Sequence, residues 1–264
     1  MEFKIDRKKV FCATGGQPFN AKKRTVILIH GAGMDHSYWS LQSRWFAWHD
    51  WSVLAPDLPG HRDSGGRSLP SIEKMSAWIG HLMEEAGLKE AALVGHSMGA
   101  IVALQAAADM PNRVNRIALL GVADAIPVHP DLLEAAKIND PLAYDLVTSW
   151  GHGRNAHFGG NQQPGIWMLG SGRQLLARNR PGVLYSDLHA CNEWKNGLNA
   201  ARKTRCRALV IIGDGDQMTP PKRTQLIVDA LPECKRVVLE KCGHMMMQEQ
   251  PDQTLDALIA EFQN

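Results

Sequence analysis

Short runs of apolar residues alternate with segments of helical period along most of this 264-residue chain, and this alternation restricts the folds that it can adopt. Apolar runs of a few residues predict buried strands, whereas apolar residues three or four positions apart predict helices. Strands separated by helices form mostly parallel sheets with helices on both faces. We therefore predict an α/β fold with a mostly parallel sheet of about eight strands. The strand candidates are residues 25–29, 51–55, 91–94, 116–120, 208–212 and 236–239.

Three helices of this pattern carry clear signals. Ser71 is placed to cap a helix whose apolar face includes Ile72, Met75 and Ile79. Thr219 and Pro220 suit the cap and the first position of a second helix. The predicted buried residues of the second and the last helix are Leu226, Ile227, Ala230 and Leu231, and Leu255, Leu258, Ile259 and Phe262.

The alternation stops after Ala123, and the next part of the chain has helical pieces but no convincing buried strand. Helices are predicted at residues 141–150 and 183–194, and a Gly- and Gln-rich stretch, 151–165, joins them. Because strands resume at residue 208, these helices are expected at the carboxyl ends of neighbouring strands, where open α/β sheets bind ligands. The prediction is a core of residues 1–124 and 204–264 with a helical insertion of residues 125–203.

Charge and cysteine content exclude several classes of function. The chain has 29 Lys and Arg against 27 Asp and Glu and no long block of like charge, so nucleic-acid binding is not indicated. No stretch approaches the roughly 20 apolar residues of a membrane span, and the first residues lack a secretory apolar core, so a cytoplasmic protein is expected. The five cysteines are scattered without CxxC spacing, which predicts reduced thiols rather than disulfides or zinc.

A serine flanked by glycines follows the third strand candidate. Residues 93–100 read Leu-Val-Gly-His-Ser-Met-Gly-Ala, with Ser97 between Gly95 and Gly99. A serine at the apex of a sharp strand-to-helix turn has strained backbone angles, and its hydroxyl is exposed at the tip of the sheet. Glycines two positions away allow the strand and the helix to approach closely. Ser97 is therefore a candidate nucleophile.

Three further segments could supply what a nucleophilic serine needs. His30-Gly31-Ala32-Gly33 follows the first strand, where the amide of Ala32, with that of Met98, could stabilise a developing negative charge. Asp214 and Asp216 lie just past the strand at 208–212, and either carboxylate could orient a histidine. His244 follows the last strand. Ser, Asp and His in this chain order, each after a separate strand, is the order of α/β-hydrolases.

The chain resembles the α/β-hydrolase superfamily. The resemblance extends over the whole chain except the insertion, and five segments carry it. The matching residues are 30–33, 55–61, 95–99, 213–220 and 243–244. The resemblance implies Ser97 as nucleophile, His244 as base and Asp216 as acid. It also implies the backbones of Ala32 and Met98 as oxyanion donors and the insertion as a helical cap.

The acid has two other candidates. Members of the superfamily usually carry the acid three residues after the strand-end glycine and four before a proline, which favours Asp216. Asp214 precedes a glycine and is better suited to form a turn. Some members hold the acid after the preceding strand, where Asp124 lies.

The resemblance implies a serine hydrolase that needs no cofactor and cleaves small or medium carboxylic esters, with lactones as a further substrate class. A serine at position 97 argues against haloalkane dehalogenases and epoxide hydrolases, which carry an aspartate there. Three alternatives remain: a hydrolase of carbon–carbon bonds in ring-cleavage products, a cofactor-free perhydrolase that admits peroxide in place of water, and a receptor-like protein that binds a ligand with slow or no turnover. No partner other than a small-molecule substrate is predicted.

Large apolar side chains near these loops and in the insertion predict an apolar substrate pocket. An alternative for each is packing within the insertion or the core. No metal site is predicted, because His152 and His157 lack a carboxylate or cysteine at ligand spacing. The pocket candidates are Tyr38, Trp39, Trp150, Trp167, Met168, Trp194 and Met245.

Overall fold

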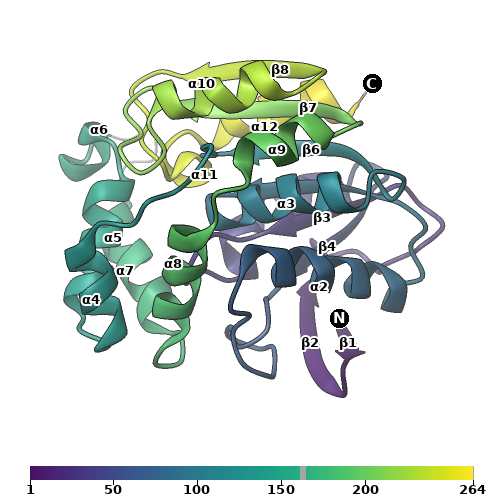
Figure 1. Ribbon diagram of the computed structural model, residues 1–264, viewed down its shortest axis with the longest axis horizontal. Helices are drawn as coiled ribbons and strands as arrows, with labels where there is room; N and C mark the ends of the chain where they lie inside the picture. The colour runs from purple at the N-terminus through teal and green to yellow at the C-terminus, as the bar shows by residue number, and fades with distance from the viewer. Residues whose placement is uncertain (161–164, 264) are drawn as a thin grey trace.

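The computed structural model describes residues 1–160 and 165–263 and has an eight-stranded sheet at its centre. The strand order is β1-β2-β4-β3-β5-β6-β7-β8 (Figure 1). Strands β3 to β8 run parallel, and β1 and β2 complete one edge in antiparallel pairing. The predicted fold class is confirmed. The strands are β1 (Glu2–Ile5), β2 (Lys8–Ala13), β3 (Thr25–Ile29), β4 (Ser52–Pro56), β5 (Ala91–His96), β6 (Val114–Leu120), β7 (Arg207–Gly213) and β8 (Cys234–Leu239).

Alternate residues of the central strands pack into two separate apolar cores, one on each face of the sheet. In β3, Ile27 and Ile29 belong to one core, whereas Val26 and Leu28 belong to the other. This explains why the strand reads as a continuous apolar run, since neither of its faces meets water. The helices of the core are α1 (Ser40–Ala47), α2 (Ile72–Glu85), α3 (Met98–Asp109), α9 (Gly197–Lys203), α10 (Pro221–Ala230) and α12 (Pro251–Phe262), with the short η1 (His36–Trp39) and α11 (Met246–Glu249).

The strand register brings the loops after several strands to one edge of the sheet. Ile29 at the end of β3 pairs with Gly95, and His96 at the end of β5 pairs with Leu120. Gly213 pairs with Leu239 at the ends of β7 and β8. The loops that carry the candidate serine, aspartate, histidine and oxyanion donors therefore begin side by side.

The sequence predicted six of the strands but did not locate the hairpin of β1 and β2. Its strands carry charged and exposed side chains, so the apolar run typical of the buried strands is missing. Its two-residue turn uses Asp6 and Arg7, both with positive φ, where glycine or asparagine is the usual signal. The hairpin therefore has neither of the signals on which the other assignments depended.

The predicted start of α10 was displaced by one residue. Pro220 has extended ψ and stands at the cap position, and the helix begins at Pro221. Thr219 instead bonds to Asp216 through its amide and its hydroxyl. The set of buried residues predicted for this helix was also too large, because Leu226 is 45% exposed while Ile227 is fully buried.

The helices that follow β6, up to residue 193, form the end of the molecule at the left of Figure 1. The next helix, α9, packs on α3 and α10 beside the sheet instead. Gly197 at its start meets the loop after β6, because a Cβ there would lie 2.2 Å from the carbonyl oxygen of Asp124. We therefore take the core to resume near Gly197 rather than at residue 204. The insertion helices are α4 (Pro130–Lys137), α5 (Leu142–Gly151), α6 (Arg154–His157), α7 (Met168–Ala177) and α8 (Val183–Glu193).

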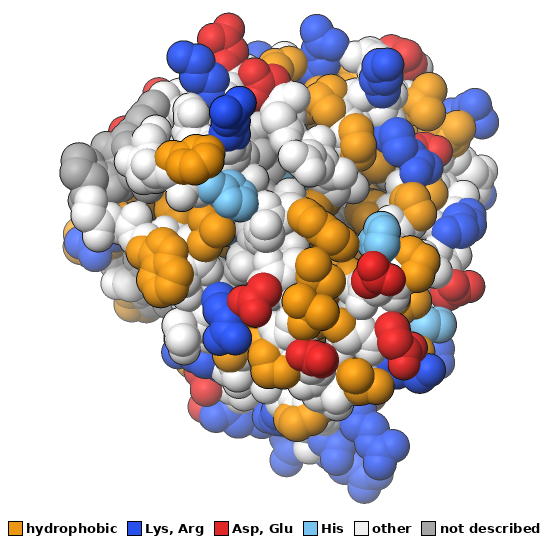
Figure 2. Space-filling model, turned by 90° about the vertical axis from the view of Figure 1, so that its left-hand side faces the viewer, with side chains coloured by type: hydrophobic (Ala, Val, Ile, Leu, Met, Phe, Trp, Pro, Cys, Tyr) orange, Lys and Arg blue, Asp and Glu red, His pale blue; other side chains and the backbone are white. Residues whose placement is uncertain are grey.

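The outer surface of the insertion carries exposed apolar side chains, including Phe158 and Trp167, which are 78% and 75% exposed. Figure 2 shows hydrophobic side chains interspersed with charged ones on this side of the molecule. Of the Gly- and Gln-rich stretch, residues 161–164 lie outside the described residues. In the part of the chain that the structure describes, no helix is long and apolar enough to cross a membrane. All five cysteines are free thiols.

Candidate active site

Ser97 occupies the turn between β5 and α3 in a strained backbone conformation. Its φ is 54° and its ψ is −117°, a combination that residues with a Cβ rarely adopt. Its amide donates to the carbonyl of Leu120 on the neighbouring strand at 2.9 Å, which fixes the turn against the sheet. The strain is thus maintained by the surrounding sheet, and the side chain is half-buried at its edge.

The two flanking glycines allow this turn to form. A Cβ on Gly95 would lie 2.0 Å from the carbonyl oxygen of Gly99. A Cβ on Gly99 would lie 2.1 Å from the carbonyl oxygen of Ile29, at the end of β3. Neither space can hold another atom, because backbone atoms form both contacts. The start of α3 therefore packs directly against β5 and against the loop that follows β3.

That loop presents Ala32 to the same space as the serine. A Cβ on Gly31 would lie 3.4 Å from the Cβ of Ser97, and both Ala32 and Ser97 line one cavity. Among the described residues, the amide of Ala32 donates no hydrogen bond to the protein. Met98 is the first residue of α3, where amides have no partner within the helix. Both amides suit the stabilisation of a negative charge.

Asp216 and His244 form a buried pair after β7 and β8. Nδ1 of His244 lies 2.8 Å from Oδ2 of Asp216, and the two residues are 1% and 3% exposed. Oδ1 of Asp216 accepts the amides of Met218 and Thr219, and Oδ2 also accepts the Thr219 hydroxyl at 2.6 Å. Burial opposes ionisation of Asp216, but His244 and the hydrogen bonds outweigh burial and lower its pKa. The carboxylate is therefore held charged and in one orientation.

The other ring nitrogen of His244 is available for chemistry. Because Nδ1 donates to a carboxylate, the neutral imidazole keeps its lone pair on Nε2. Nε2 is buried and has no hydrogen-bond partner among the described residues. His244 and Ser97 line the same cavity, although no hydrogen bond joins Nε2 to the serine hydroxyl in the described part of the chain. Such bonds often tighten only when a substrate binds.

Neither alternative acid bonds to His244. Asp214 accepts the amide of Cys242 at 3.1 Å, and so it joins two loops. Asp124 forms an ion pair with Arg223, whose Nε lies 2.8 Å from its Oδ1. Hydrogen bonding from Arg223 lowers the pKa of Asp124. Of the three carboxylates, Asp216 is the one paired with the histidine.

Three residues around His244 were not singled out from the sequence. His96 donates through Nε2 to the carbonyl of His244 at 2.9 Å, and its ring packs on the His244 ring at 4.8 Å. Burial, together with His244, lowers the pKa of His96 to about 3, so it stays neutral. Gly121 has a φ of 63°, and a Cβ there would lie 2.7 Å from Cε1 of His244. Thr219 holds the carboxylate, as described above.

Signals for these residues exist in the sequence, but they are weak. His96 stands next to Ser97 in the elbow motif, and Gly121 directly follows an apolar run. Thr219 suited a helix cap equally well, which hid its role beside Asp216.

The cavity at Ser97 has a volume of about 480 Å³ and lies between the sheet edge and the insertion. Trp150 and Met245 line it, and so do Leu132, Val147 and Leu188 of the insertion. Except for the candidate catalytic groups, His129 and Gln217, its lining is apolar. A cavity of this size fits the usual range for small-molecule sites.

Other predicted pocket residues lie elsewhere. Trp39 is fully buried in the core, and Trp194 packs beside α3, where its Nε1 donates to Gln105 at 3.1 Å. Trp167 is exposed on the outer surface. Tyr38 and Met168 line a second cavity of about 460 Å³. Sequence patterns identify large apolar residues near a site, but they do not show whether each side chain points into the cavity, into the core or toward solvent.

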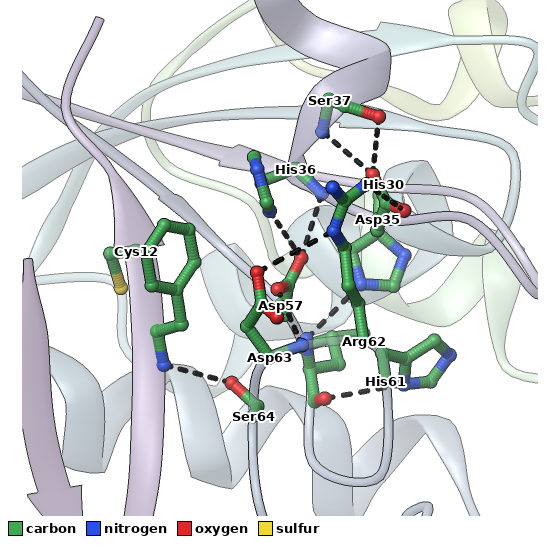
Figure 3. A network of polar contacts seen from close by, with 12 residues as sticks. Cys12, His30, Asp35, His36, Ser37, Asp57, His61, Arg62, Asp63 and Ser64 are labelled. Carbon is green, nitrogen blue, oxygen red and sulfur yellow. Dashed lines mark hydrogen bonds and ion pairs between the residues drawn. The ribbon is translucent and has the colours of Figure 1, made fainter. Parts of the chain in front are cut away.

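A cluster of Asp35, His36 and Asp57 has the composition of a metal site, but its oxygens already have donors (Figure 3). Oδ1 of Asp57 accepts both the amide and Nδ1 of His36, and Oδ2 accepts the amide of Asp63. Oδ2 of Asp35 bonds to Arg62, and to Arg178 from the insertion, each at 3.1 Å. Two guanidinium groups thus take the place that a cation would need, and the cluster serves to join loops.

Comparison with known proteins identifies a family and several related proteins. A family model described as "Alpha/beta hydrolase family" matches residues 26–257. The pimeloyl-(acyl-carrier protein) methyl ester esterase of Aromatoleum aromaticum is 24% identical over 247 residues, covering 86% of this chain and 93% of that protein. The dihydrolipoyllysine-residue acetyltransferase component of the acetoin cleaving system of Cupriavidus necator is 32% identical over 190 residues, covering 58% of this chain and only 50% of that protein.

A likeness to solved structures extends over the whole chain. The enol-lactonase from Burkholderia xenovorans LB400 matches with a TM-score of 0.86 and 21% sequence identity, and the match covers 100% of both chains. At this level of identity the likeness shows a shared fold.

Proposed function

The chain belongs to the alpha/beta hydrolase family, and from this premise we propose that it is a serine hydrolase of small to medium carboxylic esters, lactones included. The observation that carries the proposal is the cavity that Ser97 and His244 share, with His244 bonded to Asp216 behind it. The names of an esterase and an enol-lactonase among the similar proteins support this substrate class.

In the proposed reaction, Nε2 of His244 takes the proton of the Ser97 hydroxyl as the oxygen attacks the substrate carbonyl carbon. Asp216 holds the imidazole in the tautomer that this step needs, and it stabilises the imidazolium that forms. His244 then protonates the leaving alcohol. Water, deprotonated by the same nitrogen, attacks the acyl-enzyme and releases the acid.

The oxyanion of each tetrahedral intermediate would be held by the amides of Ala32 and Met98. Both belong to short backbone segments that neighbouring atoms fix in place, so no reorganisation is needed when the charge develops. Removing one such donor in well-studied hydrolases lowers turnover by about 10²- to 10³-fold. The apolar lining of the cavity favours an acyl or alcohol group without charge.

Reaction with a fluorophosphonate probe, followed by peptide mapping, tests the proposal. We expect the probe to label Ser97 stoichiometrically and to block hydrolysis of p-nitrophenyl butyrate in parallel. A panel of esters and lactones of increasing acyl length then defines the substrate class. Absence of labelling, or labelling at another residue, would contradict the proposal.

The same assays separate the proposal from the receptor-like protein and from the carbon–carbon bond hydrolase. A stoichiometric burst without sustained turnover would support the receptor-like reading, because the acyl-enzyme would form and then persist. Turnover of a vinylogous diketone with no activity on esters would support the carbon–carbon bond hydrolase.

Met245 is expected to limit the length of the acyl chain. Its sulfur accepts the hydroxyl hydrogen of Tyr38 at 3.0 Å, and Met245 lines the first cavity while Tyr38 lines the second. Met245→Ala removes this divider and should let a longer chain enter the second cavity. Burying a methylene contributes about 0.8 kcal/mol, so one or two extra methylenes raise the octanoate-to-butyrate ratio of kcat/KM about 4- to 15-fold.

Met218→Ala is the matched control, because Met218 lines the first cavity but not the second, and the Tyr38 hydroxyl donates to Met245 instead. It enlarges the first cavity by the same side chain and leaves the divider in place. An equal rise in the ratio for both variants would mean that cavity volume, rather than the divider, sets the preference.

A further inference from the structure

A buried, hydrogen-bonded pair of a histidine and an aspartate joins the core to the insertion beside the oxyanion loop. Nε2 of His61, from the loop after β4, lies 2.8 Å from Oδ2 of Asp187 on α8. His61 is 1% exposed and Asp187 is fully buried. Neither residue takes part in the proposed reaction, and burying such a pair is costly unless its geometry is well satisfied. Because both side chains are buried, contact with water does not explain why polar residues stand at these positions.

The same carboxylate oxygen binds the backbone of the oxyanion loop. Oδ2 of Asp187 accepts the amide of Gly33 at 2.8 Å, and Nδ2 of Asn179 donates to the Gly33 carbonyl. Both polar groups of the Gly33 backbone are therefore held by side chains of the insertion. A Cβ on Gly33 would lie 2.8 Å from Leu184 and 3.0 Å from Leu176, so the insertion also packs directly on this residue.

Gly33 is the critical position of the turn that presents Ala32. The amide of Met34 donates to the carbonyl of Gly31 at 3.1 Å, which closes a four-residue turn with Ala32 and Gly33 at its centre. The φ of Gly33 is 64°, as a type II turn requires at this position. Type I and type II turns differ in the orientation of the central peptide, which is the peptide that carries the Gly33 amide. The hydrogen bond that the Gly33 amide donates to Asp187 selects one of the two orientations of this peptide.

The contacts of His61 show that its ring carries both protons. Nδ1 faces the carbonyl oxygens of Leu58 and Pro59, each at 3.2 Å, and Nε2 faces the carboxylate. Each ring nitrogen thus meets only acceptors, so both must donate. Burial alone would lower the pKa of His61, but Asp187 and these carbonyls outweigh burial and raise it.

Three other titratable groups lie near the pair among the described residues, and neither His30 nor Cys191 adds a charge beside the His61 ring. His30 packs on His61 at 4.7 Å and accepts the amide of Leu58 through Nε2; burial and the charge of His61 lower its pKa to about 4. Cys191 faces Asp187, and burial raises its pKa, so it stays a thiol. Asp57 faces His30, and its bonds to His36 keep it ionised. His61 and the Gly33 amide both bond to Oδ2 of Asp187, and its Oδ1 has no partner among the described residues, so His61 is the titratable partner of this carboxyl group.

We propose that His61 and Asp187 are positioning residues that hold the Ala32–Gly33 turn in the orientation needed to stabilise the oxyanion, and that they make this orientation depend on a docked insertion. The proposal rests on the proposed function, because it assigns the turn a catalytic purpose. The pair acts through the Gly33 amide and touches no reacting atom.

This arrangement predicts a loss of turnover at alkaline pH. A histidine whose pKa is raised on folding contributes its interaction below the ordinary value of about 6.5 and loses it as pH rises through the raised value. Above that point the His61 ring loses one proton, its interaction with Asp187 weakens, and the turn that Asp187 holds through the Gly33 amide is released. The kcat of the unmodified protein should therefore fall on the alkaline side to the level of a His61→Gln variant, whose own kcat should show no such alkaline fall.

Asp187→Ala is the main test. It removes the acceptor of the Gly33 amide, and we expect kcat for p-nitrophenyl butyrate to fall about 10- to 100-fold with KM nearly unchanged, less than the loss of an oxyanion donor itself. Asp187→Asn keeps an oxygen for the Gly33 amide and should recover part of this loss. If Asp187→Ala does not fold, His61→Gln tests the same link, because it removes the ring that bonds to Asp187, and its kcat should also fall with KM nearly unchanged.

Arg180→Gln is the matched control, because Arg180 also joins the insertion to the core but binds the carbonyl of Ser64, at 2.9 Å, rather than Gly33. It should lower the melting temperature without lowering kcat at temperatures where the protein is folded. Equal losses of kcat in Asp187→Ala and Arg180→Gln would overturn the proposal, since the pair would then only anchor the insertion.

NMR distinguishes failure of this proposal from failure of the proposed function. The Gly33 amide resonance should shift as His61 titrates, and ¹⁵N spectra should show both His61 nitrogens protonated at neutral pH. If these signals appear and no ester is hydrolysed, the proposed function fails and the link between the pair and the turn stands. A Gly33 amide that does not respond to His61 would refute that link whatever the activity.

Discussion

Ser97→Ala is expected to lower kcat for p-nitrophenyl esters by about 10⁶-fold, the loss seen when the nucleophile of a well-studied triad is removed. The hydroxyl is the group that forms the acyl-enzyme, and no other hydroxyl in the described lining of the cavity can replace it. Stability should change little, because alanine also has a Cβ and retains the backbone bonds that hold the turn. Activity assays with circular dichroism check both expectations.

A double variant makes the first result more specific. If Ser97 and His244 act as one unit, the variant that combines Ser97→Ala with His244→Ala should be no less active than Ser97→Ala alone. A further large loss in the double variant would show that His244 catalyses the reaction without the serine. Fluorophosphonate labelling should be absent in both variants.

The sequence predicted the central sheet because its strands are buried on both faces. Residues 25–29 were assigned with the bounds that the structure has, since four apolar residues in succession after Thr25 fit a strand between two layers of helices. The β1–β2 hairpin was missed for the opposite reason, because it lies at the sheet edge with charged side chains. Edge strands depend on pairing with a neighbour, which a local pattern does not contain.

For the candidate site, the sequence predicted which loops carry the site residues, but it did not predict which side chains meet between those loops. Ser97, Asp216 and His244 follow strands, so the alternation of strands and helices already places them at one edge. The contributions of His96 and Gly121 depend on contacts between loops far apart in the chain. Asp187 is a helical residue among many polar ones, and only its approach to Gly33 distinguishes it.

Asp216→Asn is expected to lower kcat by about 10⁴-fold, the effect of the corresponding change in a well-studied serine protease. An amide at this position can donate to Nδ1 of His244, which moves the imidazole proton to Nε2 and removes the lone pair that the serine proton needs. The Asn side chain keeps the shape of the carboxylate, and one oxygen can still accept the amides of Met218 and Thr219. The change therefore alters the tautomer more than the fold, which a kcat measurement beside a melting curve checks.

Asp214→Asn and Asp124→Asn are the matched controls for this prediction, since each removes one carboxylate charge near the same sheet edge. Asp214 accepts an amide and Asp124 pairs with Arg223, so their loss should affect stability while kcat stays within a few-fold of the unmodified protein. Normal kcat in Asp216→Asn with a large loss in Asp124→Asn would move the acid to the end of β6. Because the Asp216 side chain is the one within 2.8 Å of Nδ1, that outcome would require the loops after β7 and β8 to rearrange when substrate binds.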